Sequence, residues 1–476
     1  MHRFITKYKN MADPIKASLW FVIASIIQRG ISFITTPIFT RLLTTDEYGS
    51  VSVFHSWYGI FSIFLTLNLA SGVYNKAMTK WADKRDEVTA SMLGLTSVVT
   101  LSFLIVYLFA IDFWNSIFNM NTPLMLTIFI QSYFSIAYSF WAAGQRYDYK
   151  YRMLVIVSLA IAIVSPILGI LAVKMVPYKA EARIISLAFV QIVIGFYFYI
   201  RIIRKGRKIY SKQFWLYALQ FNIPLIPHYL AQTVLGSSDR IMISNMVGNS
   251  QAAIYDIAYI ISTITSLLTT AVNDSFIPYT FKAIKAERTE NVKKYTIYLS
   301  TFVLAICVLA ICFGPEIIRI IATPDYYEAR WVVPPVAAAI FFTFIRSFYC
   351  NIEFYYEKTK FVMVASSGAA VLNVVLNYLF IPVFGYIAAA YTTLVCYIIL
   401  MLLHYCMYRI VCRKMKLNRV YNDRVLFFMG ILILSFMGII TIFYDYLIVR
   451  YSIVVVIVMS AFVYRKKLLS LFKEIK

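Results

Sequence analysis

Runs of about 20 apolar residues recur from one end of this chain to the other, each long enough to cross the ~30 Å hydrocarbon core of a bilayer. Of its 476 residues, 61% are hydrophobic and only 14% are charged. A soluble protein of this length needs more charge on its surface. The sequence therefore predicts an all-α polytopic membrane protein without an attached soluble domain.

The apolar runs predict about fourteen transmembrane spans. The first run follows basic residues and has no small-residue cleavage site, so we expect a retained span rather than a removed signal peptide. The predicted spans lie near 17–39, 49–71, 87–111, 122–144, 153–175, 184–203, 216–237, 252–274, 296–318, 331–352, 361–382, 386–408, 425–444 and 449–464.

The net charge of +23 follows from the predicted topology. When alternate loops are assigned to opposite sides, one side holds about 35 of the 45 Lys and Arg residues and the other about eight. That asymmetry predicts that the basic side is cytoplasmic and that both termini lie in the cytoplasm. The basic loops 201–208 and 409–416 are typical of anionic-lipid contacts, at about 1 kcal/mol per basic residue, rather than of nucleic-acid binding.

A weak internal repeat predicts two lobes. Residues 41–66 align with 245–270, each segment ending one span, crossing a short polar loop and opening the next span on small and tyrosine residues. Parallel repeats that face a central site are a recurring plan for transporters. The predicted division is 1–210 for spans 1–6, 211–410 for spans 7–12, and 411–476 for two additional spans and a tail.

One permanently charged residue interrupts the first span. Placing Arg29 in mid-span costs about 2.5–3.5 kcal/mol on insertion scales, so its side chain is expected to face protein or a water-filled cavity. Polar residues share its helix face at steps of three and four: Ser25, Ser32 and Thr36. The stripe fits either a ligand-contacting arginine or a structural ion pair with a neighbouring helix.

The eighth predicted span carries the most complete polar stripe, and the second span carries a shorter one. Hydroxyl and amide groups at this density suit sugar hydroxyls or water, although interhelical hydrogen bonding by Ser and Thr would produce the same pattern. The candidate sugar contacts from these spans are His55, Tyr255, Tyr259, Ser262, Ser266 and Asn273, and Asp256 flanks the second stripe as a coupling candidate.

The seventh predicted span contains Pro224 and Pro227 within one turn, and each removes a backbone donor and bends a helix. Histidine side chains have an unperturbed pKa near 6.5. Nearby His228 is therefore a candidate to carry a coupling proton, and the alternative is a hydrogen-bonded packing residue. In the tenth span, Arg346 and Glu353 lie seven residues apart on one face and fit either a cavity charge or an ion pair.

The sequence contains no motif of an enzyme, a metal site or a cofactor site: it lacks a phosphate loop, a zinc-protease motif and a nucleophile elbow. The six cysteines have no loop spacing of a disulfide framework and are expected to be small buried residues. The longest predicted exterior loop, near 319–330, has about a dozen residues, too few for a catalytic platform. We therefore expect a protein that is not an enzyme and whose energy source is an ion gradient or lipid flow.

Several segments resemble bacterial polysaccharide flippases (Wzx-like) of the multidrug/oligosaccharidyl-lipid/polysaccharide (MOP) exporter superfamily. The first two spans resemble the family's opening, and the seventh and eighth spans resemble its second-half motif, except that Ala252–Ala253 precede Ile254 where the family often has a glycine. Residues 313–337 are similar to a third segment. The matching residues are Pro37, Arg41, Leu42, Leu43, Asp46 or Glu47, Gly49, Pro224, Pro227, Ser238, Asp239, Arg240, Tyr255, Ala258 and Tyr259.

The resemblance implies two six-helix lobes in a V with two further helices. It also implies transport of an undecaprenyl-pyrophosphate-linked oligosaccharide (an O-antigen, capsule or exopolysaccharide unit) from the cytoplasmic to the outer leaflet by alternating access. On this reading the pyrophosphate contacts basic groups that line the cavity, with Arg29 as the first candidate and Arg346 as the second. The alternatives are a multidrug/cation antiporter of the same superfamily and a membrane glycosyltransferase or polymerase. The sugar unit, the coupling ion (H⁺, Na⁺ or none) and contact with a polymerase complex stay open.

Overall fold

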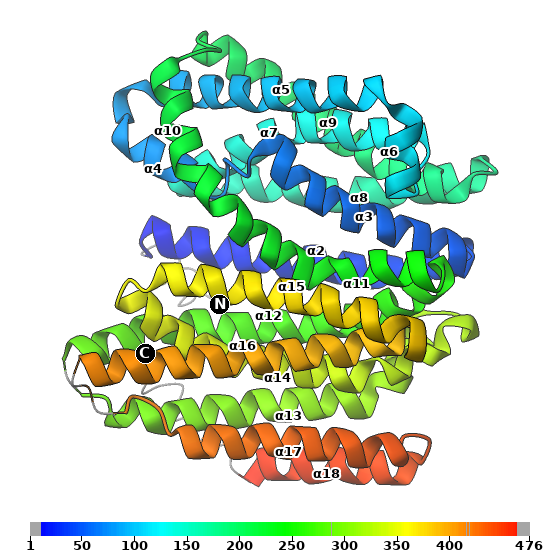
Figure 1. The fold of residues 1–476 in the computed structure, drawn as a ribbon, viewed down its shortest axis with the longest axis vertical. Helices are drawn as coiled ribbons and strands as arrows, with labels where there is room; N and C mark the ends of the chain where they lie inside the picture. The colour runs from blue at the N-terminus through cyan, green and yellow to red at the C-terminus, as the bar shows by residue number, and fades with distance from the viewer. Residues whose placement is uncertain (1–10, 287, 416, 418, 464–476) are drawn as a thin grey trace, which may run out of the picture. The chain divides into compact units, whose positions relative to one another are not determined.

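The computed structural model describes residues 11–463 except 287, 416 and 418, and in this part of the chain all regular structure is helical (Figure 1). The predicted cytoplasmic termini fall outside the described residues. The α-helices are α2 Asp13–Leu42, α3 Thr45–Thr66, α4 Val73–Lys80, α5 Arg85–Phe109, α6 Ile111–Phe118, α7 Thr122–Tyr147, α8 Tyr151–Met175, α9 Lys179–Gly206, α10 Lys212–Asn222, α11 Ile226–Met246, α12 Asn249–Lys285, α13 Glu290–Ile321, α14 Val333–Tyr355, α15 Thr359–Phe384, α16 Ile387–Lys414, α17 Asp423–Ile442 and α18 Leu447–Val463. Three 3₁₀-helices are η1 Ala82–Lys84, η2 Ile223–Leu225 and η3 Pro324–Trp331.

Eleven segments of the described chain are long and apolar enough to cross a membrane. Three further helices, α3, α11 and α18, lie where spans 2, 7 and 14 are predicted, but α3 and α11 are less apolar and α18 has only 17 residues. The polytopic all-α class is therefore confirmed, whereas the count of fourteen spans is not.

The chain folds as two compact units, 1–233 and 234–476. Both α10 and the start of α11 belong to the first unit, because α10 packs on α4 and α5. The boundary lies within α11, 23 residues beyond the predicted end of the first lobe at 210.

The first unit is held by close helix packing around α7 and α9. Small residues let backbones approach there: a Cβ built on Gly195 of α9 would lie 2.3 Å from the Phe134 carbonyl oxygen of α7. Helix α2 packs mainly on α8 and is the least buried of the eleven candidate spans. This exposure places most of the α2 surface outside the core of its own unit.

The loop between α2 and α3 is closed by a capping box. The Thr44 hydroxyl accepts a hydrogen bond from the Glu47 N–H, and the Glu47 carboxylate accepts one from the Thr44 N–H at 2.8 Å. These two bonds satisfy backbone donors that the first turn of a helix leaves free. The acidic residue of the turn before Gly49 therefore has a local structural role.

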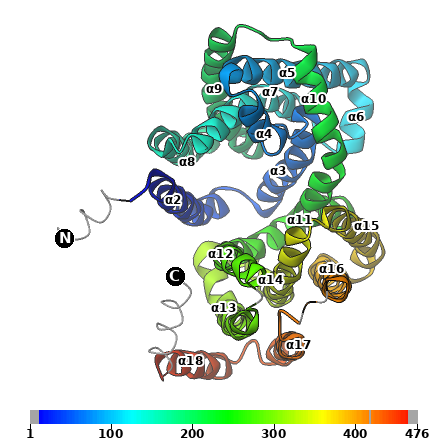
Figure 2. The ribbon, with the colours of Figure 1, turned by 90° about the vertical axis from the view of Figure 1, so that its left-hand side faces the viewer.

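In the second unit, α14 is the most buried span and lies among α12, α13, α16 and α17 (Figure 2). Its side chains on nearly every face belong to one apolar core, which includes Phe341, Phe344 and Phe348. A helix that is apolar all round is typical of the centre of a bundle. This position brings the few polar side chains of α14 into contact with neighbouring helices.

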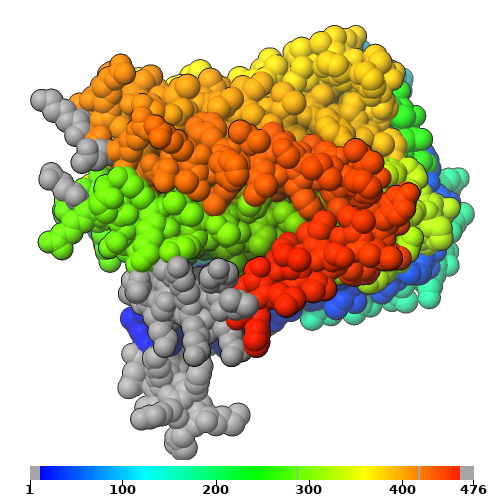
Figure 3. All heavy atoms as spheres, turned by 90° about the horizontal axis from the view of Figure 1, so that it is seen from below, coloured from blue at the N-terminus to red at the C-terminus, as the bar shows by residue number. Residues whose placement is uncertain are grey.

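The last two helices lie on the outer face of the second unit (Figure 3), and a proline explains how they attach to α13. Pro315 has no N–H, so the Ile311 carbonyl loses its usual partner within α13. The Tyr444 hydroxyl donates to that carbonyl at 2.9 Å, and Arg450 donates to the Cys312 carbonyl at 2.6 Å. Arg450 also bonds both carboxylate oxygens of Glu316, at 2.6 and 2.7 Å.

One cysteine prediction is wrong. Cys406 is exposed, whereas the other five cysteines are buried. The apolar composition around Cys406 indicated burial, but its position on α16 faces away from the helices that α16 packs against. Cys412 is buried in the last turns of α16 rather than in a basic loop.

We expect Gly195→Ala to lower the thermal unfolding temperature in detergent, because the methyl group overlaps the α7 backbone and overpacking costs roughly 1–3 kcal/mol. The matched control is Gly30→Ala in the same unit, where a Cβ meets no atom within 4 Å. Alanine favours a helix over glycine by about 1 kcal/mol, so the control should hold or raise the unfolding temperature. Equal behaviour of the two variants would contradict the close approach of α7 and α9.

Candidate functional site

A carboxylate lies buried among four helices of the second unit. Asp239 on α11 is 1% exposed. Its Oδ2 accepts hydrogen bonds from the Tyr255 hydroxyl of α12 at 2.5 Å and the Thr393 hydroxyl of α16 at 2.9 Å. Its Oδ1 accepts a bond from the Asn377 amide of α15 at 2.7 Å.

A second layer of polar groups holds these donors in place. The Asn373 amide donates to Thr393 Oγ1 at 3.0 Å, and the Thr392 hydroxyl donates to the Asn377 carbonyl oxygen. Asn373, Asn377 and Thr393 are fully buried. We call Asp239, Tyr255, Asn373, Asn377, Thr392 and Thr393 the Asp239 cluster.

The neighbouring arginine does not neutralise Asp239. Arg240 forms an ion pair with Asp256 of α12, donates to the Gly236 carbonyl at 2.8 Å, and lies over the Tyr259 ring with 4.6 Å to its centroid. Among the ion pairs of the described residues, none includes Asp239. The donors to Asp239 are therefore all neutral groups.

This arrangement defines what the Asp239 cluster can do chemically. An ionised carboxylate is costly to bury unless another charge accompanies it, whereas a protonated carboxyl or a carboxylate with a bound cation is not. Carboxylate, amide and hydroxyl oxygens gather within this one cluster, and oxygen atoms are the ligands that hard cations prefer. The cluster therefore contains groups to which a proton or a small hard cation can bind.

Sequence reasoning missed most of this cluster. It selected Tyr255, but it treated Asp239 only as part of a family motif and did not select its partners on α15 and α16. One signal was available: Asn373 and Asn377 are four residues apart in an otherwise apolar span, so they share a helix face. The identity of their partner was not readable, because Asp239 and Asn377 are 138 residues apart.

The predicted stripe of the first span lies on α2, in the first unit. Ser25, Arg29 and Ser32 are exposed on the surface of that unit, and Thr36 is buried. The Thr36 hydroxyl donates to the Ser32 carbonyl at 2.9 Å. The first three side chains are thus outside the core of their own unit.

The predicted stripe of the eighth span is divided between two environments of α12. Tyr255 belongs to the Asp239 cluster, and Tyr259 contacts Tyr255 and Arg240. Further along α12, the Asn273 side-chain oxygen accepts hydrogen bonds from Ser347 and Asn351 of α14, both at 2.9 Å. Further residues of the stripe differ in burial: Ser262 is buried and Ser266 is exposed.

The other candidates are spread over three helices. His55 is exposed on α3, and His228 is half-buried on α11. The predicted bend is present as η2, which contains Pro224, and as the start of α11, which contains Pro227. Arg346 is half-buried on α14, its Nε has no hydrogen-bond partner, and no ion pair joins it to Glu353.

The solved structures that this chain resembles in fold include a flippase and multidrug transporters. The chain is similar to the lipid II flippase MurJ in an inward closed conformation, with 16% identity, coverage of 94% of this chain and 100% of that chain, and a TM-score of 0.68. It is also similar to an inward-facing multidrug resistance transporter of the MATE family, with 12% identity, 85% and 100% coverage, and a TM-score of 0.60. A third similar structure is a MOP superfamily transporter from Pyrococcus furiosus. It is 12% identical, the match covers 86% of this chain and 98% of that chain, and the TM-score is 0.57. Identities this low show the fold alone, and it is the fold of these MOP-type transporters.

Matches to sequence families identify the family of this chain. The chain belongs to the polysaccharide biosynthesis protein family, whose model matches residues 15–284. The MatE family model matches residues 224–379. A protein of the Lsg locus of Haemophilus influenzae is 20% identical over 376 residues, which cover 75% of this chain and 89% of that protein. The protein is therefore a multi-pass membrane protein of the polysaccharide biosynthesis protein family, with a fold like that of MOP-type transporters.

We expect Asn377→Ala to destabilise the second unit by about 1–3 kcal/mol, because Asp239 loses a donor and the Thr392 hydroxyl loses its acceptor in a fully buried site. The measurement is the thermal unfolding temperature in detergent. The control is Asn245→Ala on an exposed position of α11, which should change it little. An unfolding temperature for Asn377→Ala equal to that of the control would show that the cluster contributes nothing to stability.

Proposed function

We propose that this protein is a flippase for undecaprenyl-pyrophosphate-linked oligosaccharides, which it moves from the cytoplasmic to the outer leaflet of a bacterial cytoplasmic membrane by alternating access. The observation that carries the proposal is the exposed Arg29 in the middle of an apolar helix, in a chain of the polysaccharide biosynthesis protein family. The MurJ likeness supports it, because that protein's description is a lipid II flippase.

The proposal explains why an arginine is kept in this helix. A guanidinium exposed to hydrocarbon is unfavourable by several kcal/mol, so its side chain needs water, protein or an anionic ligand. A pyrophosphate accepts charge-assisted, bidentate hydrogen bonds from a guanidinium, which are among the strongest hydrogen bonds in proteins. Ser25 and Ser32 on the same face of α2 supply hydroxyls beside the charge.

The proposed direction of transport uses the orientation that the charge distribution of the loops predicts. Loops that the topology assigns to one side carry most of the Lys and Arg, and the positive-inside rule makes that side cytoplasmic. Lipid-linked precursors are anionic, so the basic loops also attract their head groups from the cytoplasmic leaflet. Arg346, an arginine near the middle of α14, is the second proposed pyrophosphate contact.

We assign cation coupling to the Asp239 cluster rather than to His228 or Asp256. Asp256 is already paired with Arg240, and His228 lies outside the network of buried oxygen ligands. A buried carboxylate with neutral donors gains or loses a charge partner when a cation binds, so the packing of α11, α12, α15 and α16 becomes sensitive to the cation. Such sensitivity is what an ion-driven transporter requires.

Arg29→Ala should leave the lipid-linked precursor on the cytoplasmic leaflet and reduce surface polysaccharide at least tenfold, and Arg29→Lys should restore part of the export because it retains the positive charge. The assay is complementation of a deletion strain, with membrane abundance measured for each variant. Arg152→Ala, an exposed arginine at the start of α8, is the control and should export normally.

Normal export by well-expressed Arg29→Ala would overturn the assignment of the pyrophosphate contact to α2. Normal precursor distribution in the deletion strain, together with lost resistance to cationic drugs, would instead support the drug antiporter.

Asp239→Asn should abolish the cation dependence of the protein while Asp256→Asn retains it, because only the first change removes the buried carboxylate. The measurement is the unfolding temperature of purified protein at fixed ionic strength, with Na⁺ exchanged for choline, and at two pH values with Na⁺ absent. If Asp239→Asn removes the effect of Na⁺ on the unfolding temperature, the ion that binds at Asp239 is Na⁺. If it removes the effect of pH, the ion is H⁺. A cation effect that survives Asp239→Asn would contradict the assignment.

A further inference from the structure

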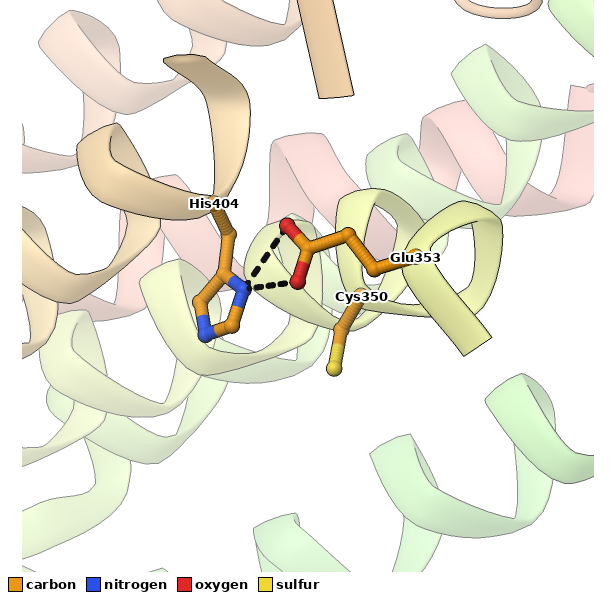
Figure 4. Close-up of side chains that lie close together, drawn as sticks. All are labelled: Cys350, Glu353 and His404. Atoms are coloured by element: carbon orange, nitrogen blue, oxygen red, sulfur yellow. Dashed lines mark hydrogen bonds and ion pairs between the residues drawn. The ribbon is translucent and has the colours of Figure 1, made fainter. Parts of the chain in front are cut away.

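A second polar cluster of the second unit contains three different metal-ligating side chains. Cys350 and Glu353 lie three residues apart on α14, and His404 lies opposite them on α16 (Figure 4). One ligand atom of each residue lies within 4.8 Å of the other two. Cys350 is 6% exposed, and the other two are fully buried. We call these three residues the Cys350–Glu353–His404 cluster.

The two ring nitrogens of His404 have different surroundings. Nδ1 lies 3.0 Å and 2.9 Å from the two carboxylate oxygens of Glu353. Nε2 is buried and has no hydrogen-bond partner. The edge of the Phe361 ring packs on the imidazole, with ring centroids 5.9 Å apart, and fixes its orientation. Nδ1 is therefore the nitrogen that faces the other two ligand atoms.

We propose that the Cys350–Glu353–His404 cluster binds one divalent transition-metal ion of the zinc class. A thiolate, an imidazole and a carboxylate are the ligands that Zn²⁺ takes in proteins, and a set of three leaves a fourth position open. A thiolate excludes the harder cations Na⁺ and Mg²⁺ as preferred occupants. The donor chemistry thus differs from that of the Asp239 cluster, which offers carboxylate, hydroxyl and amide groups but no thiolate or imidazole.

The separations between the ligand atoms of the cluster are compatible with a bound zinc ion after a small adjustment. Ligand atoms around a tetrahedral zinc ion are about 3.5 Å apart, given Zn–S of about 2.3 Å and Zn–N of about 2.0 Å. The thiol must therefore approach by about 1 Å, and Glu353 and His404 must separate by a few tenths of an ångström. A change of side-chain torsion is enough for both, because two of the ligands are on one helix.

The three ligands can neutralise a divalent ion. With Cys350 as a thiolate, Glu353 as a carboxylate and His404 neutral, the ion and its ligands together carry no net charge, and Arg346 on α14 adds one positive charge nearby. Binding requires the thiol to lose its proton, so affinity for the ion is expected to fall at low pH. Ligands on both α14 and α16 make the bound ion a cross-link between two helices of the second unit.

Sequence reasoning gave no indication of this site. Cys350 and Glu353 have a spacing that helices often use for two ligands of one ion, but the third ligand is 51 residues from Glu353. The seven-residue spacing in the sequence instead indicates a pair between Glu353 and Arg346, because both share a face of α14. The structure pairs it with His404 instead.

The test uses the purified, tag-free full chain in detergent, with the exposed Cys406 changed to Ser so that it cannot bind metal at the surface. After treatment with a chelator, Zn²⁺ is added by equilibrium dialysis against a weak competing chelator and counted by mass spectrometry, and Co²⁺ is followed by its visible and thiolate absorption bands. We expect about one ion per chain and a cobalt–thiolate band.

Cys350→Ser should remove the cobalt–thiolate band and weaken Zn²⁺ binding at least tenfold, and Glu353→Gln and His404→Gln should weaken it similarly. The matched control is Cys396→Ser, a buried cysteine of α16 outside the cluster, which should bind as the parent does. Folding of each variant is checked by gel filtration.

A folded parent chain that takes up no Zn²⁺ would overturn the proposal, as would Cys350→Ser that binds as tightly as Cys396→Ser. If individual variants fail to fold, the absorption band of the parent still decides, since a cobalt spectrum without thiolate character excludes Cys350 as a ligand. Neither measurement depends on transport activity, so the outcome is independent of the proposed flippase function.

Discussion

Polar groups placed inside an apolar bundle must find their partners within the protein, and this constraint shapes every internal contact of the second unit. The carbonyl that Pro315 leaves free in α13 is satisfied by Tyr444, and the adjacent carbonyl by Arg450. Each of these bonds joins elements that are far apart in sequence. The C-terminal helices are therefore attached through polar contacts at the proline of α13, in addition to apolar packing. Asp239 likewise finds its hydrogen-bond partners on other helices.

The first unit meets the constraint differently. Its helices approach closely at glycines, and aromatic rings fill the remaining space, as where Trp141 stacks on Phe198 with centroids 4.2 Å apart. Its most unusual polar group, Arg29, is left outside this packing on α2. A guanidinium in the middle of an apolar helix is costly in hydrocarbon, and this cost is the physical basis of the proposed role of Arg29 in binding a pyrophosphate.

Two buried polar clusters within one unit have different chemistry. The Asp239 cluster surrounds one carboxylate with two hydroxyl groups and an amide N–H from three other helices, and its carboxylate and hydroxyl oxygens suit a proton or a hard cation. The Cys350–Glu353–His404 cluster adds nitrogen and sulfur from two helices, which suits a borderline metal ion. Both include residues of α16, so this helix links the proposed ion-coupling site to the proposed metal site.

The sequence by itself determined the helical membrane class, the approximate position of most spans and the mid-span location of Arg29, because apolar length and periodicity are local properties of the chain. The tertiary structure alone decided which polar groups meet. Asp239 lies 138 residues from Asn377 and 154 from Thr393, and Glu353 lies 51 from His404. Hydropathy shows that each group lies in or near an apolar helix, but a hydrogen-bond partner depends on which helices pack together and in which rotation about their axes. These quantities arise only when the whole bundle assembles.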